Sequence, residues 1–192
     1  MKIPEFKPSK RFLGDTDLPC LVAKVKNSKL PGVASRYIAE FRKDPMCEIY
    51  LLGKEPQQIN AWQQTMLEQL FEKEGLATAI TEGMKDYETN CIADDPYEEF
   101  EGQDRQQIRE GGIASFVSIE YVVIDALEEK ALLSVNIFES ILFGEHGVTL
   151  HLNDGRWCFE DGDYLTSYPS NQTPLKDVPP AKLSWLKRLF GG

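Results

Sequence analysis

The chain has 192 residues, of which 42% are hydrophobic, 27% charged and 10% aromatic, the balance of an ordinary globular protein. It contains 21 Lys and Arg against 31 Asp and Glu, which gives a formal net charge of −10. This acidity disfavours binding to nucleic-acid phosphates, because such binding requires a basic surface. An acidic surface instead favours long-range attraction to a basic protein partner.

Targeting signals and paired cysteines are missing from the sequence. The first eight residues lack the apolar run of a signal peptide, and no stretch of 18 apolar residues occurs. We therefore expect a cytoplasmic protein with no membrane segment. The spacings of Cys20, Cys47, Cys91 and Cys158 match no zinc pattern and no redox pair. We expect free thiols, and neither a metal nor another cofactor.

The N-terminal part of the chain predicts two strands after an irregular lead-in over residues 1–17. Leu18–Lys26 contains Leu21, Val22 and Val25 among polar residues. Met46–Leu52 contains Cys47, Ile49 and Leu51 in alternation, which is the period of a half-buried strand. Val33–Phe41 lies between them and fits either a strand or a short helix.

Two helices, or one long bent helix, are predicted from about Pro56 to Asn90. Pro56 suits the first turn of a helix, and Gly75 suits a helix end. Apolar residues on both sides of Gly75 recur at helical spacing: Ile59, Trp62, Met66, Leu67, Leu70 and Phe71, then Leu76, Ala79, Ile80, Met84 and Tyr87. Gly83 interrupts the second face at a cost of up to ~1 kcal/mol relative to Ala.

The C-terminal half of the chain predicts further strands. After a polar loop over residues 92–112, the apolar run Ile113–Ile124 predicts a central strand. The alternation from Leu133 to Ile137 predicts the next strand. The short segment Asp125–Lys130 would join these two strands as an antiparallel pair.

A β-hairpin is predicted at Asp154-Gly155, because both residues of such a turn must tolerate positive φ. Its register pairs Asn153 with Arg156, Leu152 with Trp157, His151 with Cys158, and Leu150 with Phe159. The apolar residues of both strands then share one face. Together the elements predict an α+β domain over residues 1–168, with a mostly antiparallel sheet and a helical pair covering one face. Residues 169–192 predict a Pro-rich connector and a short C-terminal helix.

The facing pair His151 and Cys158 is a candidate for catalysis, because a Cys beside a His can act as an activated nucleophile. The sequence identifies neither a third group to orient the His nor an oxyanion site. The spacing of His146 and His151 does not match the two-His motif of metalloproteases. A hydrolase or transferase that uses a Cys-His pair is therefore the alternative function.

Residues 94–104 hold six acidic residues and no basic one. Such a run fits a solvated loop, and it also fits a docking loop for a basic partner. In the second interpretation, Tyr97 and Phe100 anchor the partner while the carboxylates steer its approach. These carboxylates belong to Asp94, Asp95, Glu98, Glu99, Glu101 and Asp104.

A short motif carries a family resemblance. The segment Leu142–Val148, with Glu145-His146-Gly147 at its centre, leads into the Asp154-Gly155 hairpin, which ends at Glu160-Asp161-Gly162. This pattern resembles a group of uncharacterised bacterial domains, over about Leu51–Asp163. Some members look like immunity proteins of bacterial toxin systems. The resemblance implies toxin binding rather than catalysis, and it adds Glu145 and His146 to the partner-binding candidates.

From these observations we expect a non-enzymatic protein-binding module, an immunity-type inhibitor of a basic protein such as a bacterial toxin. We expect it to bind neither nucleic acid nor membranes. The sequence leaves its oligomeric state open.

Overall fold

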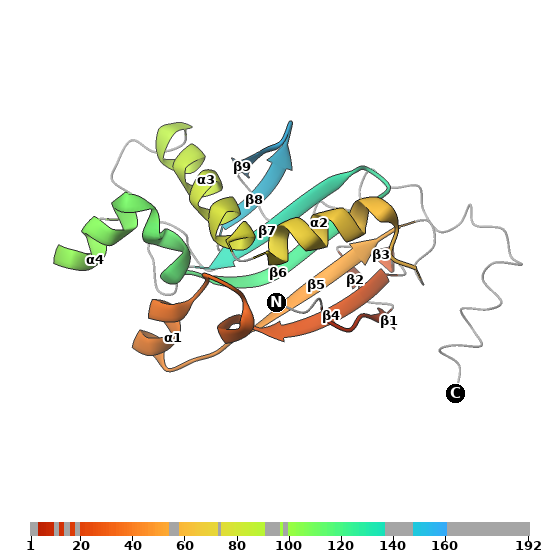
Figure 1. The fold of residues 1–192 in the computed structure, drawn as a ribbon, viewed down its shortest axis with the longest axis horizontal. Coiled ribbons are helices and arrows are strands. Elements are labelled where there is room, and N and C mark those ends of the chain that lie inside the picture. Colours follow the sequence, from red (N-terminus) through yellow and green to blue (C-terminus); the bar gives the residue numbers. More distant parts are fainter. Residues whose placement is uncertain are drawn as a thin grey trace, which may run out of the picture.

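The computed structural model describes residues 4–9, 12–13, 16–17, 20–53, 58–72, 74–90, 97, 100–136 and 148–160. Seven strands form one sheet in the order β1-β4-β5-β6-β7-β8-β9, and β2 and β3 form a separate pair. Within the seven-stranded sheet, β5 and β6 are parallel and every other neighbouring pair is antiparallel. Helices α2 and α3 lie against one face of this sheet (Figure 1). The predicted α+β class is confirmed, including the helical pair on one face.

The strands are Lys7–Ser9 (β1), Phe12–Leu13 (β2), Thr16–Asp17 (β3), Cys20–Lys26 (β4), Met46–Leu52 (β5), Ser118–Asp125 (β6), Lys130–Asn136 (β7), Val148–Asn153 (β8) and Arg156–Glu160 (β9). The helices are Ser35–Phe41 (α1), Ala61–Phe71 (α2), Gly75–Asn90 (α3) and Gly102–Gln107 (α4). Short 3-10 turns occupy Asn27–Lys29 and Ile113–Ser115, and a π-helical turn occupies Ile108–Gly112. The predicted connector and helix over residues 169–192 lie outside the described residues.

Two predictions for the N-terminal part are confirmed and one is wrong. Strands β4 and β5 match the two predicted strands, and Val33–Phe41 becomes the helix α1. The lead-in is not wholly irregular, because β1 pairs with β4 through Ser9 opposite Cys20. This pairing depends on a neighbouring strand, which a local composition of Lys and Pro does not reveal.

Helix α2 begins later than predicted, at Ala61 rather than near Pro56. The side chain of Asn60 accepts a hydrogen bond from the Gln63 backbone N–H (2.8 Å), and the Gln63 side chain accepts one from the Asn60 N–H (3.1 Å). This capping box satisfies two amides at the start of the helix. Gln63 also donates from Nε2 to the Leu52 carbonyl (2.7 Å), which ties α2 to the end of β5.

Helix α3 packs closely on the sheet because Gly83 has no side chain. A Cβ at Gly83 would lie 2.7 Å from Cδ2 of Leu150, a fully buried residue on β8. One turn further along α3, the ring of Tyr87 lies 4.3 Å from that of Phe159 on β9. The glycine that weakens the helix pattern in the sequence therefore permits the contact between helix and sheet.

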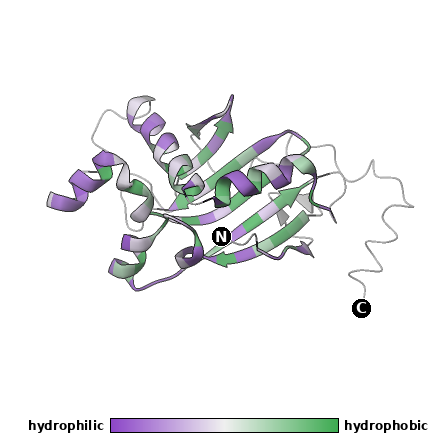
Figure 2. Cartoon of the chain, in the orientation of Figure 1, coloured by the Kyte–Doolittle hydropathy of each residue, from purple (hydrophilic) through white to green (hydrophobic). Residues whose placement is uncertain are grey.

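The polar segment before the central strand contains helix, so the prediction of a loop over residues 92–112 is wrong in part. Helix α4 and the π-helical turn occupy its second half, and Figure 2 shows α4 coloured mainly as hydrophilic. Strand β6 begins at Ser118, five residues later than predicted, because Ile113 and Ala114 are buried in a 3-10 turn. An apolar run indicates burial but does not by itself separate a strand from a buried turn.

The predicted hairpin is confirmed in every pair of its register. Asp154 and Gly155 have φ values of 48° and 78°, as the two-residue turn requires. Trp157 is 9% exposed and belongs to the core under the helices, together with Leu150. The hydrophobic pattern of the two strands thus fixed their register correctly.

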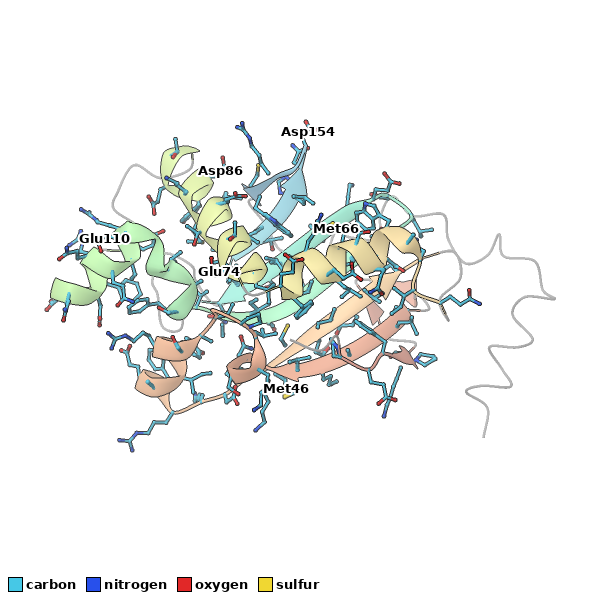
Figure 3. The ribbon with its side chains drawn as sticks, viewed as in Figure 1. Met46, Met66, Glu74, Asp86, Glu110 and Asp154 are labelled. Atoms are coloured by element: carbon cyan, nitrogen blue, oxygen red, sulfur yellow. The ribbon has the colours of Figure 1, made fainter. Side chains whose placement is uncertain are left out.

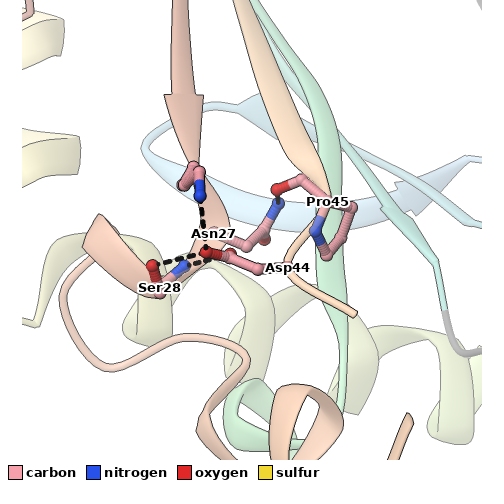
Figure 4. Close-up of polar contacts among 5 residues, drawn as sticks. Asn27, Ser28, Asp44 and Pro45 are labelled. Atoms are coloured by element: carbon pink, nitrogen blue, oxygen red, sulfur yellow. Dashed lines mark hydrogen bonds and ion pairs between the residues drawn. The ribbon is translucent and has the colours of Figure 1, made fainter. Parts of the chain in front are cut away.

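The buried side chain of Asn27 joins three strands at one end of the sheet. Its Nδ2 donates to the carbonyls of Pro45 (3.0 Å) and Ile119 (2.9 Å), while its Oδ1 accepts from the Ile119 N–H (2.8 Å). Beside it, the N–H and hydroxyl of Ser28 both donate to the Asp44 carboxylate (Figure 4). Asn27 therefore connects the end of β4 with the starts of β5 and β6.

Replacing Asn27 should strongly destabilise the protein. Asn27→Ala leaves the Ile119 N–H and C=O buried without their partner, and we expect a loss of about 2–4 kcal/mol in the free energy of unfolding. Ser28→Ala is the matched control, because it removes only the exposed hydroxyl bond to Asp44, which should contribute under about 1 kcal/mol. Urea denaturation measures both; equal midpoints for the two variants would contradict the role assigned to Asn27.

A methyl group at position 83 should push α3 away from β8. Gly83→Ala gains up to ~1 kcal/mol in helix propensity but must displace the buried Leu150, so we expect a net loss of about 1–2 kcal/mol. In a Leu150→Ala background the added methyl fills space, and Gly83→Ala should be neutral or stabilising. A double-mutant cycle measured by urea denaturation gives this coupling. Additive effects would mean that the two residues do not limit the approach of the helix.

Candidate protein-interaction surface

The structure describes four of the ten predicted partner-binding residues. Asp94, Asp95, Glu98, Glu99, Glu145 and His146 lie outside the described residues. Tyr97 is only 2% exposed and belongs to the main core, so the prediction of an exposed anchor is wrong for this residue. Phe100 is half-buried, and its ring meets that of Phe116 edge-on at 5.6 Å. An aromatic residue within an acidic run gives the same sequence pattern whether it binds a partner or the protein's own core.

The other two described candidates are Glu101 and Asp104. Glu101 is exposed and precedes the first turn of α4. Asp104 lies 4.0 Å from the guanidinium of Arg36 on α1, and about half of each side chain is exposed. An ion pair so open to water contributes little to stability. Both carboxylates are thus available at the surface, although Asp104 already has a cation beside it.

Charge is unevenly distributed along the chain. Residues 54–160 contain 22 Asp and Glu against 7 Lys and Arg, whereas residues 1–53 contain 6 against 10. The net charge of −10 therefore comes from the part that builds α2, α3, α4 and the last four strands. The acidic run at 94–104 supplies only six of these 22 carboxylates.

The helical pair concentrates carboxylates on its outer side. Residues 58–90 carry six carboxylates and two lysines, Lys73 and Lys85. We call the six carboxylates the acidic helical layer: Glu68, Glu72, Glu74, Glu82, Asp86 and Glu88. Asp86 is half-buried and the other five are exposed. Figure 3 labels Glu74 and Asp86 from this set.

This layer follows directly from the helical repeat. The apolar residues predicted at helical spacing, such as Leu67, Leu70 and Ile80, are buried against the sheet. The positions between them therefore face outward, and most of the charged ones are acidic. Within the part of the chain that the structure describes, the carboxylates of Glu72, Glu74, Glu82 and Glu88 form no ion pair. This surface is not among the predicted sites, although the polar positions of the same helical repeat carry a signal for it in the sequence.

Asp86 connects the acidic helical layer with the edge of the sheet. One of its carboxylate oxygens accepts a hydrogen bond from the Phe159 N–H of β9 (3.0 Å). Strand β9 lies at one end of the strand order, and a carboxylate on such an edge discourages pairing with another chain. One carboxylate of the layer therefore reaches the β9 end of the sheet.

The facing pair His151 and Cys158 exists as predicted, but its surroundings do not activate the thiol. Partial burial and the nearby charge of Asp86 raise the pKa of Cys158, with smaller contributions from Asp154 and Glu82. Arg156 acts in the opposite direction and is outweighed. An activated cysteine needs a lowered pKa and electropositive surroundings. This arrangement gives no support to the alternative function.

The described ranges hold neither a cluster of metal ligands nor a membrane-spanning helix. No group of three or more His, Cys, Asp or Glu residues is arranged there to hold a metal ion. Cys20, Cys47 and Cys158 are free thiols, as predicted, and burial raises the pKa of Cys47. No helix among these residues is both long enough and apolar enough to cross a membrane.

Comparisons of the chain with family models, curated proteins and solved structures find no match.

The raised pKa of Cys158 predicts a slow reaction with alkylating reagents. Less thiolate is present at a given pH, so in a Cys91→Ser background iodoacetamide should modify Cys158 more slowly than the thiol of N-acetylcysteine amide at pH 7.5. Asp86→Asn should accelerate the reaction by removing a negative charge. Mass spectrometry of timed samples measures both rates. A Cys158 that reacts faster than the free thiol would reinstate the nucleophile hypothesis.

Proposed function

We propose that this protein is a non-enzymatic, cytoplasmic binding module that holds a basic protein partner on its acidic helical layer. The observation that carries the proposal is the collection of six carboxylates on α2, α3 and the link between them, five of them exposed, with two lysines in the same stretch. Four of the six have no ion-pair partner among the described residues, so their charge is available to an external cation.

The packing of the helices supports binding rather than mere solubility. Gln63 ties α2 to β5, and Gly83 lets α3 lie close against β8. The carboxylates therefore project from a fixed frame, which lowers the entropy lost when a partner binds. Complementary charge speeds association and suppresses wrong partners more than it adds affinity.

The resemblance around Glu145 and His146 adds a partner class to this proposal. Members of that group that look like immunity proteins suggest a basic bacterial toxin as the partner. In this proposal the protein inhibits the toxin by occupying its basic surface. The carboxylates of the run at 94–104 add to the same negative charge, while Tyr97 lies in the core, Phe100 packs on Phe116, and neither contacts the partner.

Neutralising the acidic helical layer should slow partner binding without unfolding the protein. The test variant replaces Glu72, Glu74, Glu82 and Glu88 by Gln. The matched control replaces Glu40, Glu120, Glu128 and Glu129, four exposed glutamates outside the layer, and removes the same charge. Affinity capture from the cells of origin with the wild-type protein first identifies the partner.

Stopped-flow mixing with that purified partner at low and high salt then gives the association rates. We expect a drop of about tenfold or more for the layer variant at low salt, shrinking at high salt, and under about threefold for the control. Equal drops in both variants would show that net charge alone matters, and would contradict binding at this layer. Capture of a stoichiometric small molecule and no protein would contradict the function itself.

A further inference from the structure

The end of the molecule where β4 meets β5 carries the opposite charge. Five exposed cations occupy the last part of β4, the following 3-10 turn and the link from α1 to β5. We call this set the basic pole: Lys24, Lys26, Lys29, Arg42 and Lys43. These five cations lie together although the whole chain has a net charge of −10.

Hydrogen bonds of the backbone and of Asp44 join the two segments that carry these cations. Asn27 and Ser28 bind Pro45 and Asp44, which fixes the 3-10 turn bearing Lys29 against the segment after Lys43. Lys26 lies opposite Met46 in the register of β4 and β5. Residues from two separate segments thereby form one surface; Figure 4 shows the contacts of Asn27, Ser28, Asp44 and Pro45 that hold the segments together.

The acidic residues of this surface are already engaged by internal partners. Asp44 accepts two bonds from Ser28 and lies 3.9 Å from the ammonium of Lys26. Although burial acts to raise it, these bonds and the nearby lysines hold the pKa of Asp44 below its ordinary value. Glu48 pairs with Lys24 at 2.6 Å and accepts a bond from the Tyr50 hydroxyl. Asp44 and Glu48 are thus two carboxylates among the five cations of the basic pole, and both are already bound within the protein.

An exposed apolar side chain lies beside these cations. Met46 is 43% exposed, and Leu127, on the β6–β7 turn, is the other large exposed hydrophobic residue of the described ranges. In Figure 3 Met46 lies at the opposite side of the molecule from Asp86 and Asp154. Methionine is flexible and polarisable, which suits a contact surface. An apolar anchor surrounded by charges is the usual arrangement of a protein-docking hot spot.

We propose that the basic pole is a second docking surface, which takes an acidic polypeptide segment with an apolar side chain seated on Met46. Charge complementarity selects an acidic occupant. A polypeptide fits better than a nucleic acid, because the overall charge of −10 repels a long chain of phosphates while an exposed methionine offers phosphates nothing. One apolar side chain is too little for membrane attachment.

The binding test uses a fluorescein-labelled, C-terminally amidated peptide of twelve residues that contains six Glu and two Leu. Fluorescence anisotropy at low salt compares the wild-type protein with the triple variant Lys26→Gln, Lys29→Gln and Lys43→Gln. The matched control is Lys85→Gln, Lys130→Gln and Arg156→Gln, which changes the net charge equally outside the basic pole. Exposed substitutions of this kind leave stability within about 0.5 kcal/mol, and urea midpoints check this.

We expect affinity for the peptide to fall about tenfold or more in the triple variant and less than about twofold in the control. Met46→Ala should weaken binding about threefold with little salt dependence, because its contact is apolar. The Gln variant of the acidic helical layer should bind the peptide at least as well as wild type. Failure of this inference is therefore distinguishable from failure of the proposed function.

Three results would overturn the inference. Equal losses of affinity in the triple variant and the control would show that binding depends only on the net charge of the protein. Tighter binding of a twelve-nucleotide single strand than of the peptide would make the surface a phosphate site. Self-association that is seen by sedimentation and lost in the triple variant, without peptide binding, would assign the surface to a second copy of the chain.

Discussion

The side-chain amide of Asn27 binds the backbone of β6 at Ile119, where no residue of β5 pairs with that strand. Strands β5 and β6 are parallel, and their register begins with Glu48 opposite Tyr121. Ile119 lies two residues earlier on β6, beyond this pairing, and both of its backbone polar groups are bound by Asn27. A carboxamide can do this because it offers one acceptor and two donors, as a peptide unit offers a donor and an acceptor. The same side chain binds Pro45 and so sets where β5 begins.

The parallel pair explains why the helices lie where they do. A parallel connection needs a crossover, and the chain between β5 and β6 supplies it with α2, α3 and α4. Gln63 binds the end of β5 and so fixes the start of this crossover. Gly83 allows α3 to pack closely on Leu150 of β8. With the inner faces fixed in this way, the acidic positions of α2 and α3 are left exposed, except for the half-buried Asp86 that binds β9. The acidic surface is thus a consequence of the strand order as much as of composition.

The sequence predicted the elements that depend on local patterns. The hairpin at Asp154 and Gly155 and the buried faces of α2 and α3 were correct, because turn chemistry and helical spacing act over a few residues. Features set by distant partners were not predictable in this way. The choice of helix for α1, the pairing of β1 and the bonds of Asn27 to Ile119 depend on contacts across the sheet, up to 92 residues apart.

In the candidate site, too, the local pattern is visible in the sequence and the arrangement that depends on the fold is not. The acidic run at 94–104 is obvious in the sequence because its charges are contiguous. The charges of the acidic helical layer are spread from Glu68 to Glu88 and form one surface only after the helices form and pack. The burial of Tyr97 was missed because an acidic neighbourhood says nothing about where an aromatic ring lies once the chain folds.

Carboxyl-group footprinting of the complex tests the central claim most directly. Carbodiimide and glycine ethyl ester label each accessible Asp and Glu, and mass spectrometry compares the free protein with the protein bound to its captured partner. Our account predicts that Glu72, Glu74, Glu82 and Glu88 lose most of their labelling in the complex, while Glu40, Glu128 and Glu129 keep theirs. Unchanged labelling of the four helical glutamates, with protection elsewhere on the protein, would contradict it.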